Sequence, residues 1–407
     1  MRARISYGSQ SIDSGDAAAV ADVLVSPNLT QGPAVRAFED ALREYTGARY
    51  CVSCSSGTAA LHLACLALGL GPSDRVVTSP VTFFASANCA LYVGARPEFA
   101  DIDPETANLS PARLEERLHA MEAGEGAVTG AVIAVHYAGT PCDMEALAAA
   151  ARRHGMYLIE DACHALGAWW TDSSGRRRVV GDCALSEMTV FSFHPVKSIT
   201  TGEGGAVTTN DETLYRRLLR LRNHGVERDP SRFVHEDPAR PGRAPGPWYH
   251  ELRELGFNYR LSDIHCALGA SQMKRLDGFI ERRNEIAALY DELFSGLSGV
   301  AAPSVPPGRR SARHLYPLRI DFDGLGVDKV EWFSAMDGRG IALQVHYIPV
   351  HLQPLYRRRL GYGPGDFPEA ERFYRREASL PIYPLLSDGD ARRVADAAAE
   401  TLAGLSP

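Results

Sequence analysis

The sequence predicts an α/β protein with a mostly parallel central sheet in a large domain, followed by a smaller α+β C-terminal domain. Its 407 residues exceed what one hydrophobic core usually spans, which favours two domains. From about residue 49 the chain alternates short β-branched runs with helical patterns. That alternation is typical of a parallel sheet covered by helices on both faces.

Seven short apolar runs are the expected strands of the large domain: residues 50–53, 75–79, 97–101, 131–136, 156–160, 190–193 and 206–209. Helical patterns lie between several of them, as at residues 58–68 and 144–153. An N-terminal helix over about residues 15–24 could belong to either domain. These elements place the large domain at residues 1–260.

The alternation of strands and helices stops at residues 229–248 (DPSRFVHEDPARPGRAPGPW), where proline, arginine and glycine predict a long surface loop or flap. The small domain, residues 261–407, begins with a long helical pattern over 262–293. We expect a strand at 314–321, a helix at 327–338, a strand at 341–348 and a final helix at 388–402.

Composition excludes several function classes. The net charge is −7, so no bulk positive field exists to hold nucleic acid or an anionic membrane. We expect no signal peptide and no membrane span, and hence a cytoplasmic protein. Eight scattered cysteines are interpreted as buried thiols; the single C-x-x-C pair, Cys51 and Cys54, is weak support for zinc, and no metal is expected.

Only three of the 43 basic residues are lysines, namely Lys197, Lys274 and Lys329. Lys197 follows a strand, a proline and a glycine-closed loop (FSFHPVKSITTGEGG), the kind of strand end at which open α/β sheets bind ligands. Lys274 and Lys329 have the pattern of solvated surface charges. Lys197 is therefore the candidate Schiff-base nucleophile, although a loop lysine in a surface ion pair is an equally plain alternative.

Three more strand ends carry functional candidates. Residues 55–61 (SSGTAAL) open a helix, so Gly57 and Thr58 suit a phosphate, although an ordinary Ser/Thr N-cap is common. Asp161 ends an apolar strand, where a carboxylate can pair with a heterocyclic N–H⁺ or cap a helix. Phe83 could stack on a flat ring, although core packing is the default. An amine, a carboxylate, an aromatic and a helix N-terminus together match the needs of pyridoxal 5′-phosphate (PLP).

The chain resembles the DegT/DnrJ/EryC1/StrS family of PLP-dependent sugar aminotransferases. The motifs that carry the resemblance span nearly the whole chain: residues 29–33 (LTQGP), 55–61 (SSGTAAL), 82–83 (TF), 160–164 (EDACH), 192–197 (SFHPVK), 202–205 (GEGG), 222–225 (RNHG), 256–260 (GFNYR) and 346–349 (HYIP). The resemblance implies the type I aminotransferase fold and a homodimer with active sites shared between subunits.

The resemblance also implies roles for single residues. Lys197 matches the lysine that forms the Schiff base, and Asp161 matches the partner of the pyridine nitrogen. His164 stands where the family often has glutamine, beside the 3′-oxygen of the cofactor. Thr58 and Ser192 match phosphate ligands, and Asn258 matches the asparagine that reaches the phosphate from the other subunit.

Within the family the motifs are most similar to the pseudaminic-acid aminotransferases. These aminate the C4 ketone of UDP-2-acetamido-2,6-dideoxy-β-L-arabino-hexos-4-ulose, usually with L-glutamate as donor. Candidate sugar contacts are Thr30, Arg260, His314 and His346; histidine and arginine suit a diphosphate, although a structural role is as common for any one histidine. Other UDP-, GDP- or dTDP-linked keto sugars, and a non-catalytic PLP-binding regulator, stay open. Lysine at 197 argues against dehydration at C3, and the absence of a G-x-G-x-x-G motif argues against a dinucleotide-dependent oxidoreductase.

Overall fold

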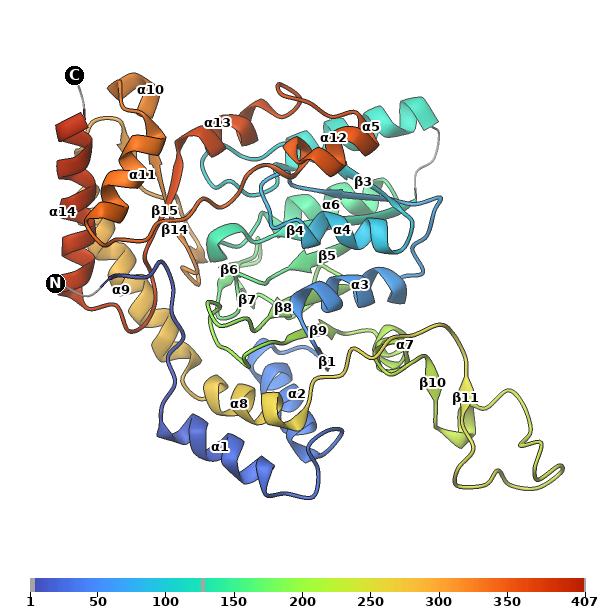
Figure 1. Ribbon diagram of the computed structural model, residues 1–407. Coiled ribbons are helices and arrows are strands. Elements are labelled where there is room, and N and C mark those ends of the chain that lie inside the picture. The colour runs from blue at the N-terminus through green and yellow to red at the C-terminus, as the bar shows by residue number, and fades with distance from the viewer. Residues whose placement is uncertain (1–3, 126–128, 406–407) are drawn as a thin grey trace.

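The computed structural model describes residues 4–125 and 129–405. A seven-stranded sheet in the order β1-β9-β8-β5-β4-β2-β3 forms its centre (Figure 1). Strand β9 is antiparallel to β1 and β8, whereas β8, β5, β4, β2 and β3 pair in parallel. The predicted fold class is therefore confirmed. The strands are β1 (Tyr50–Cys54), β2 (Arg75–Thr78), β3 (Arg96–Phe99), β4 (Gly130–Val135), β5 (Tyr157–Asp161), β8 (Met188–Ser192) and β9 (Gly205–Thr209).

Helices cover both faces of this sheet. Side chains of α2 (Pro33–Thr46), α5 (Pro111–Glu125), α6 (Met144–Arg153) and α8 (Asp263–Met273) share one buried core with it. Side chains of α3 (Gly57–Ala67), α4 (Ala85–Tyr92) and α7 (Glu212–Arg222) share the core on the other face. The strands are buried on both faces, which explains their nearly continuous apolar sequences.

The second half of the chain builds a smaller sheet, β12-β14-β15, with helices around it. Its core surrounds the fully buried Trp332 and Tyr290. The elements here are α9 (Leu276–Phe294), β12 (Val300–Ala301), β14 (Tyr316–Ile320), α10 (Phe322–Leu325), α11 (Lys329–Gly338), β15 (Glu377–Leu380) and α14 (Asp388–Leu405). Between α11 and β15, the helices α12 (Pro354–Leu360) and α13 (Pro368–Arg376) pack back on the large domain.

Helix α9 joins the two cores. Its first turns place Leu276 and Ile280 in the large core, and its later turns place Ile286 and Tyr290 in the small one. Helix α8 packs with the large core although it follows residue 260. A division into residues 1–260 and 261–407 stays a proposal, because α9 has no break between the cores.

Two predicted elements of the small domain are wrong. Residues 262–293 were expected to form one long helix. They form two, because the helix is interrupted at Lys274 and Arg275. The break lets the Arg275 guanidinium pair with Asp16 and Asp13 at the start of α1 (Ser14–Leu24). Residues 341–348 form no strand; they make isolated bridges, of Ile341 with Ile5 and of Gln344 with Ser379.

The proline-rich segment 229–248 lies within a projecting arm. The short strands β10 (Val226–Glu227) and β11 (Glu251–Leu252) pair at its base. Beyond them the arm extends away from the body of the molecule (Figure 1). Its loop is largely exposed, as predicted, although Asp237 is buried and accepts the Gly246 N–H at 2.9 Å. Over the part of the chain that the structure describes, no helix is both long and apolar enough to cross a membrane.

Candidate active site

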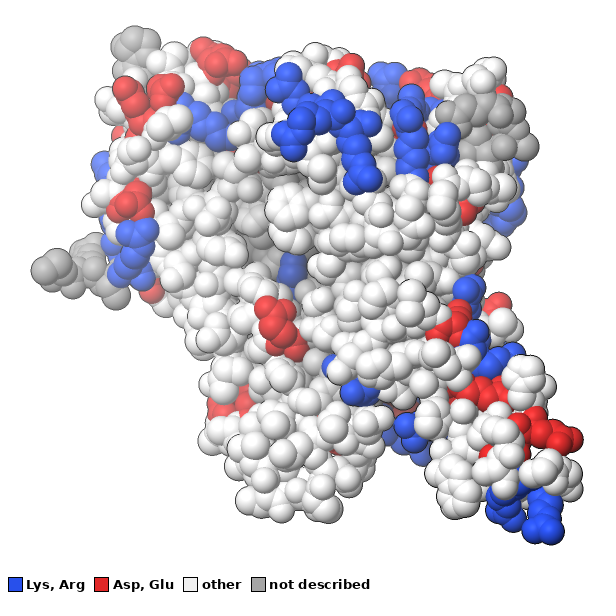
Figure 2. Space-filling view, turned by 45° about the vertical axis from the view of Figure 1, so that its right-hand side comes forward, with Lys and Arg blue, Asp and Glu red and all other residues white. Residues whose placement is uncertain are grey.

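A cavity of about 320 Å³ opens at the carboxyl ends of the parallel strands, where α/β sheets bind ligands. The space-filling view shows the molecule hollowed near the centre of this face (Figure 2). The cavity brings together nine of the twelve site residues predicted from the sequence. They are Gly57, Thr58, Phe83, Asp161, His164, Ser192, Lys197, His314 and His346.

The start of α3 forms one wall of the cavity. Ser56 caps the helix, because its Oγ accepts the Ala59 N–H at 3.1 Å. Gly57 follows against the end of β8: a Cβ at this position would lie 2.8 Å from the Ser192 Cβ and 3.1 Å from the Cys163 Sγ. Only glycine fits there without movement of its neighbours. The backbone N–H groups of this first turn and the helix dipole suit an anion.

Lys197 lies in the loop between β8 and β9. The loop is closed by the Phe193 N–H, which donates to the Gly204 carbonyl at 2.8 Å. The Lys197 Nζ lies 3.4 Å from the His314 Nε2. Removal from water lowers the pKa of Lys197 below its usual value, against the opposing effects of Cys163 and Asp161. A lysine with a lowered pKa is a better nucleophile and base near neutral pH.

Asp161, at the end of β5, is buried and faces the same cavity. Its carboxylate accepts the Ser86 hydroxyl at 2.6 Å and the Cys163 N–H at 3.1 Å. Two donors on one carboxylate hold it in place. The arrangement positions a negative charge across the cavity from a primary amine.

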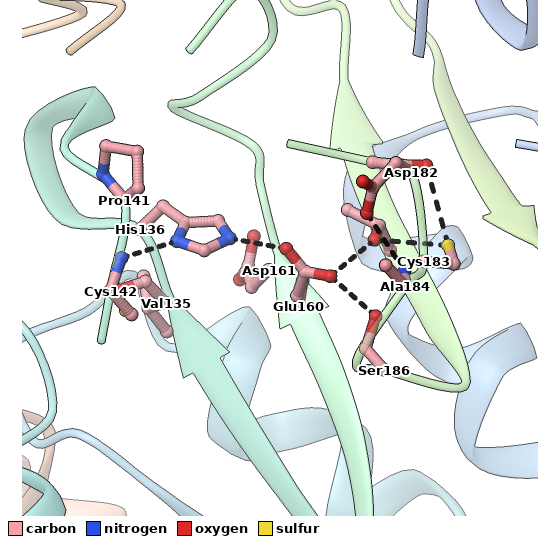
Figure 3. Close-up of polar contacts among 12 residues, drawn as sticks. Val135, His136, Pro141, Cys142, Glu160, Asp161, Asp182, Cys183, Ala184 and Ser186 are labelled. Carbon is pink, nitrogen blue, oxygen red and sulfur yellow. Dashed lines mark hydrogen bonds and ion pairs between the residues drawn. The ribbon is translucent and has the colours of Figure 1, made fainter. Parts of the chain in front are cut away.

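The neighbouring Glu160 points to the opposite face of the sheet, as alternation along a strand requires. There it meets His136 at 2.9 Å between Nε2 and Oε2, and it accepts the hydroxyls of Ser186 at 2.5 Å and Thr189 at 3.1 Å (Figure 3). The His136 Nδ1 accepts the Cys142 N–H at 3.0 Å, so its proton lies on Nε2 and is donated to Glu160. This network anchors β5 directly behind Asp161.

Histidines and a tyrosine form the wall opposite α3. The rings of His164 and His314 lie 4.4 Å apart, and the His164 Nε2 lies 3.0 Å from the Tyr347 hydroxyl. Burial first, and then the charge of Lys197, lowers the pKa of both histidines well below the usual range, so both are neutral. Within the described residues the Nδ1 atoms of both rings are buried without a hydrogen-bond partner.

Three predicted site residues lie outside this cavity. Arg260 borders a separate hollow and donates to the Asn223 Oδ1 at 2.6 Å. Thr30 bridges to Ser262, and the exposed Asn258 bridges to Asn223. Over residues 4–125 and 129–405, none of these three lines the cavity that holds Lys197.

The sequence analysis did not single out several cavity residues, among them Tyr7, Ser86 and Tyr347. Tyr347 lies in the HYIP motif at residues 346–349, so the motif could have indicated it as a site residue. Tyr7 and Ser86 lie in segments with no distinctive pattern. Phe83, the candidate for stacking on a flat ring, lines the cavity and is 47% exposed, so it is not the core residue of the alternative interpretation.

A cluster outside the cavity joins Glu115, His119 and His154, whose ligand atoms lie within 4.8 Å of one another. Its carboxylate already pairs with Arg153 at 2.6 Å and with His154 at 3.2 Å. None of the three lines the cavity, and we assign no metal to them.

The comparison with protein families shows which class of protein this chain is. A model of the DegT/DnrJ/EryC1/StrS aminotransferase family matches residues 10–399. The chain belongs to this family. It is a sugar aminotransferase, and the resemblance seen in its motifs is confirmed.

Relatives of this aminotransferase match it along most of its length. It is 38% identical to the spore coat polysaccharide biosynthesis protein SpsC of Bacillus subtilis, over 95% of this chain and 94% of SpsC. It is 37% identical to a UDP-4-amino-4,6-dideoxy-N-acetyl-beta-L-altrosamine transaminase of Campylobacter jejuni, over 96% of each chain.

Solved structures show the same fold. PseC of Helicobacter pylori, an aminotransferase of pseudaminic acid biosynthesis, superposes with a TM-score of 0.86 at 30% identity, over 98% of this chain and 100% of PseC. The PLP form of the putative sugar aminotransferase Spr1654 of Streptococcus pneumoniae has a TM-score of 0.85 at 25% identity, over 99% and 100% of the two chains.

Proposed function

We propose that this enzyme uses PLP to move an amino group from L-glutamate to the C4 ketone of a nucleotide-linked 6-deoxy sugar. The observation that carries the proposal is that Lys197 and Asp161 share one cavity with the N-terminus of α3. An amine can bind the cofactor aldehyde, a carboxylate can keep its ring nitrogen protonated, and the helix start can hold its phosphate.

The residues present fit PLP. Gly57 gives the backbone close access beside Ser192, and both line the cavity with Thr58. The unpartnered Nδ1 of the buried His164 supplies a polar atom suited to the 3′-oxygen of the ring. Phe83 presents an exposed aromatic face in the same space. When bound, PLP supplies a sink for the electrons of the breaking Cα–H bond.

Lys197 then has two tasks in the proposed reaction. Its amine holds the cofactor between turnovers, and the freed amine moves the proton from the glutamate Cα in the first half-reaction and to the sugar C4 in the second. Burial lowers the pKa of Lys197, so more of the free base is present at neutral pH. Asp161, fixed by Ser86 and the Cys163 N–H, holds the proton of the ring nitrogen.

The substrate we propose is UDP-2-acetamido-2,6-dideoxy-β-L-arabino-hexos-4-ulose, in pseudaminic acid biosynthesis. Its 4-amino product is the sugar for which the Campylobacter relative is named. His314 and His346 line the cavity beside Lys197 and are the proposed sugar contacts. SpsC supports a wider range of substrates, because its name places it in the biosynthesis of a spore coat polysaccharide.

We also propose a homodimer with shared active sites. Thr30, Asn258 and Arg260 do not reach Lys197 of their own chain. In the proposed dimer, Asn258 of the partner subunit contacts the cofactor phosphate. A dimer in solution that dissociates on substitution at the hollow around Arg260, with loss of activity, is the expected result.

The experiment is an absorbance titration followed by a substrate panel. The holoenzyme absorbs near ~420 nm because of the lysine-bound cofactor, and L-glutamate bleaches this band. The aminated product is then identified by mass among UDP-, GDP- and dTDP-linked keto sugars. A band that persists with glutamate indicates a non-catalytic PLP-binding regulator, and amination of another keto sugar alone overturns the substrate but not the reaction.

A further inference from the structure

A buried carboxylate lies behind the cavity wall at His346. Glu377, on β15, is 0% exposed. It is linked to His346 by a direct hydrogen bond and by a second path through Ser379. Its Oε2 accepts the backbone N–H of His346 at 2.9 Å, and its Oε1 accepts the Ser379 hydroxyl at 2.5 Å. The Ser379 Oγ lies 2.8 Å from the His346 Nδ1. Glu377, Ser379 and His346 thus form one continuous chain of hydrogen bonds that ends in the cavity.

The direction of this chain follows from counting hydrogens. A serine hydroxyl has one hydrogen to donate, and an ionised carboxylate only accepts. When Ser379 donates to Glu377, it can only accept from His346, so the proton of the ring lies on Nδ1. Burial, and then the charge of Lys197, lowers the pKa of His346 to about 3, so the ring is neutral and its Nε2 carries no proton. Nε2 is the ring nitrogen left for a ligand in the cavity.

The charge on Glu377 depends on pH. Burial raises the pKa of this carboxyl to about 8, and the Ser379 hydroxyl, Lys329 and the His346 N–H oppose that rise. The Lys329 Nζ donates to the Tyr374 carbonyl at 2.7 Å, which holds the cation in the small domain rather than in solvent. The expectation that Lys329 is a solvated surface charge is therefore wrong. Above about pH 8 Glu377 is ionised, and both its oxygens then accept hydrogen bonds, which makes it the acceptor end of the chain.

We propose that Glu377 is a positioning residue, which acts through Ser379 to fix His346 in the Nδ1–H tautomer and so presents its Nε2 as a hydrogen-bond acceptor to the sugar. A sugar hydroxyl or the amide N–H of an acetamido group is the matching donor. The identity of this ligand rests on the proposed function, whereas the tautomer does not.

Glu377→Gln tests the proposal with almost no change in shape. The glutamine oxygen must accept the His346 N–H, so its NH₂ group faces Ser379 and donates to it. The Ser379 hydroxyl then donates to the His346 Nδ1, and the ring proton moves to Nε2. Long-range ¹H–¹⁵N spectra of the histidine-labelled holoenzyme distinguish the two tautomers, with His346→Gln identifying the signal. At pH 9, where Glu377 is ionised, we expect Nδ1–H in the parent protein and Nε2–H in E377Q.

Glu371→Gln is the matched control. Glu371 pairs with the buried His351 at 3.1 Å, and neither residue lines the cavity. E371Q should leave the His346 signal unchanged. If E377Q does not fold, Ser379→Ala breaks the same chain without touching Glu377 and should leave a mixture of tautomers. An unchanged Nδ1–H signal in a folded E377Q or S379A protein overturns the proposal.

Kinetics distinguish a positioning role from a merely structural one, because only the former affects the sugar half-reaction selectively. E377Q turns the acceptor at Nε2 into a donor, which costs a hydrogen bond of ~1–2 kcal/mol, so KM for UDP-2-acetamido-2,6-dideoxy-β-L-arabino-hexos-4-ulose should rise about 5- to 30-fold. The glutamate half-reaction should stay within twofold of the parent. Equal loss in both half-reactions contradicts the positioning role. If the parent aminates no keto sugar, the proposed function fails, and the spectra still decide the tautomer.

Discussion

Gly57→Ala should weaken the binding of PLP. A Cβ at this position lies 2.8 Å from the Ser192 Cβ, whereas carbon atoms in contact lie about 3.5–4.0 Å apart. The start of α3 or the end of β8 must therefore move by about 1 Å. Both segments are proposed phosphate contacts. Overpacking of this kind costs ~1–3 kcal/mol. At 1.4 kcal/mol per tenfold, the affinity for PLP should fall about 5- to 150-fold.

The assay is a titration of the apoenzyme with PLP, followed by absorbance. Gly278→Ala is the control, because a Cβ at Gly278 in α9 meets nothing within 4 Å. This control should bind PLP like the parent, and its thermal stability should rise, since alanine favours a helix interior over glycine. A folded G57A protein with the affinity of the parent would refute the placement of the phosphate at the start of α3.

Three further predictions address single groups in the cavity. Lys197→Arg should abolish amination of the keto sugar while the protein stays folded, and turnover by this variant would remove Lys197 from its role. Asp161→Asn should lower the rate of the glutamate half-reaction by about 10²-fold or more, measured by stopped-flow absorbance, because the ring nitrogen loses its anionic partner. Burial lowers the pKa of His164, so below pH ~6.5 the unfolded chain binds a proton that the folded chain does not. The free energy of unfolding should therefore decrease as the pH is lowered, by about 1.4 kcal/mol per pH unit. His164→Gln should remove this part of the slope in urea unfolding at pH 7 and pH 5.5; an unchanged slope contradicts a neutral, buried His164.

Much of the large domain was predictable from the sequence. All seven predicted strands are present with ends within two residues, since strands buried on both faces have nearly continuous apolar sequences. The cavity was predictable for the same reason: Asp161, Ser192 and the start of α3 follow parallel strands, and these strands end at one edge of the sheet.

The small domain was harder, because tertiary contacts decide its local structure. The alternating residues 341–348 have the pattern of a strand, yet the backbone N–H of His346 goes to the Glu377 side chain rather than to a neighbouring strand. Strand β15 was not predicted, because a glutamate such as Glu377 is usually exposed. Its burial depends on Lys329, which is distant in the sequence. The break at Arg275 depends on Asp16, more than 250 positions earlier in the chain.

The most direct test of the central proposal is borohydride reduction of the holoenzyme, followed by peptide mapping. The chain has only three lysines, so the site of the trapped pyridoxyl group is unambiguous. We expect the group on Lys197, with the exposed Lys274 and the partly buried Lys329 unmodified. A pyridoxyl group on either of those two lysines, or on none, would contradict the proposed role of Lys197.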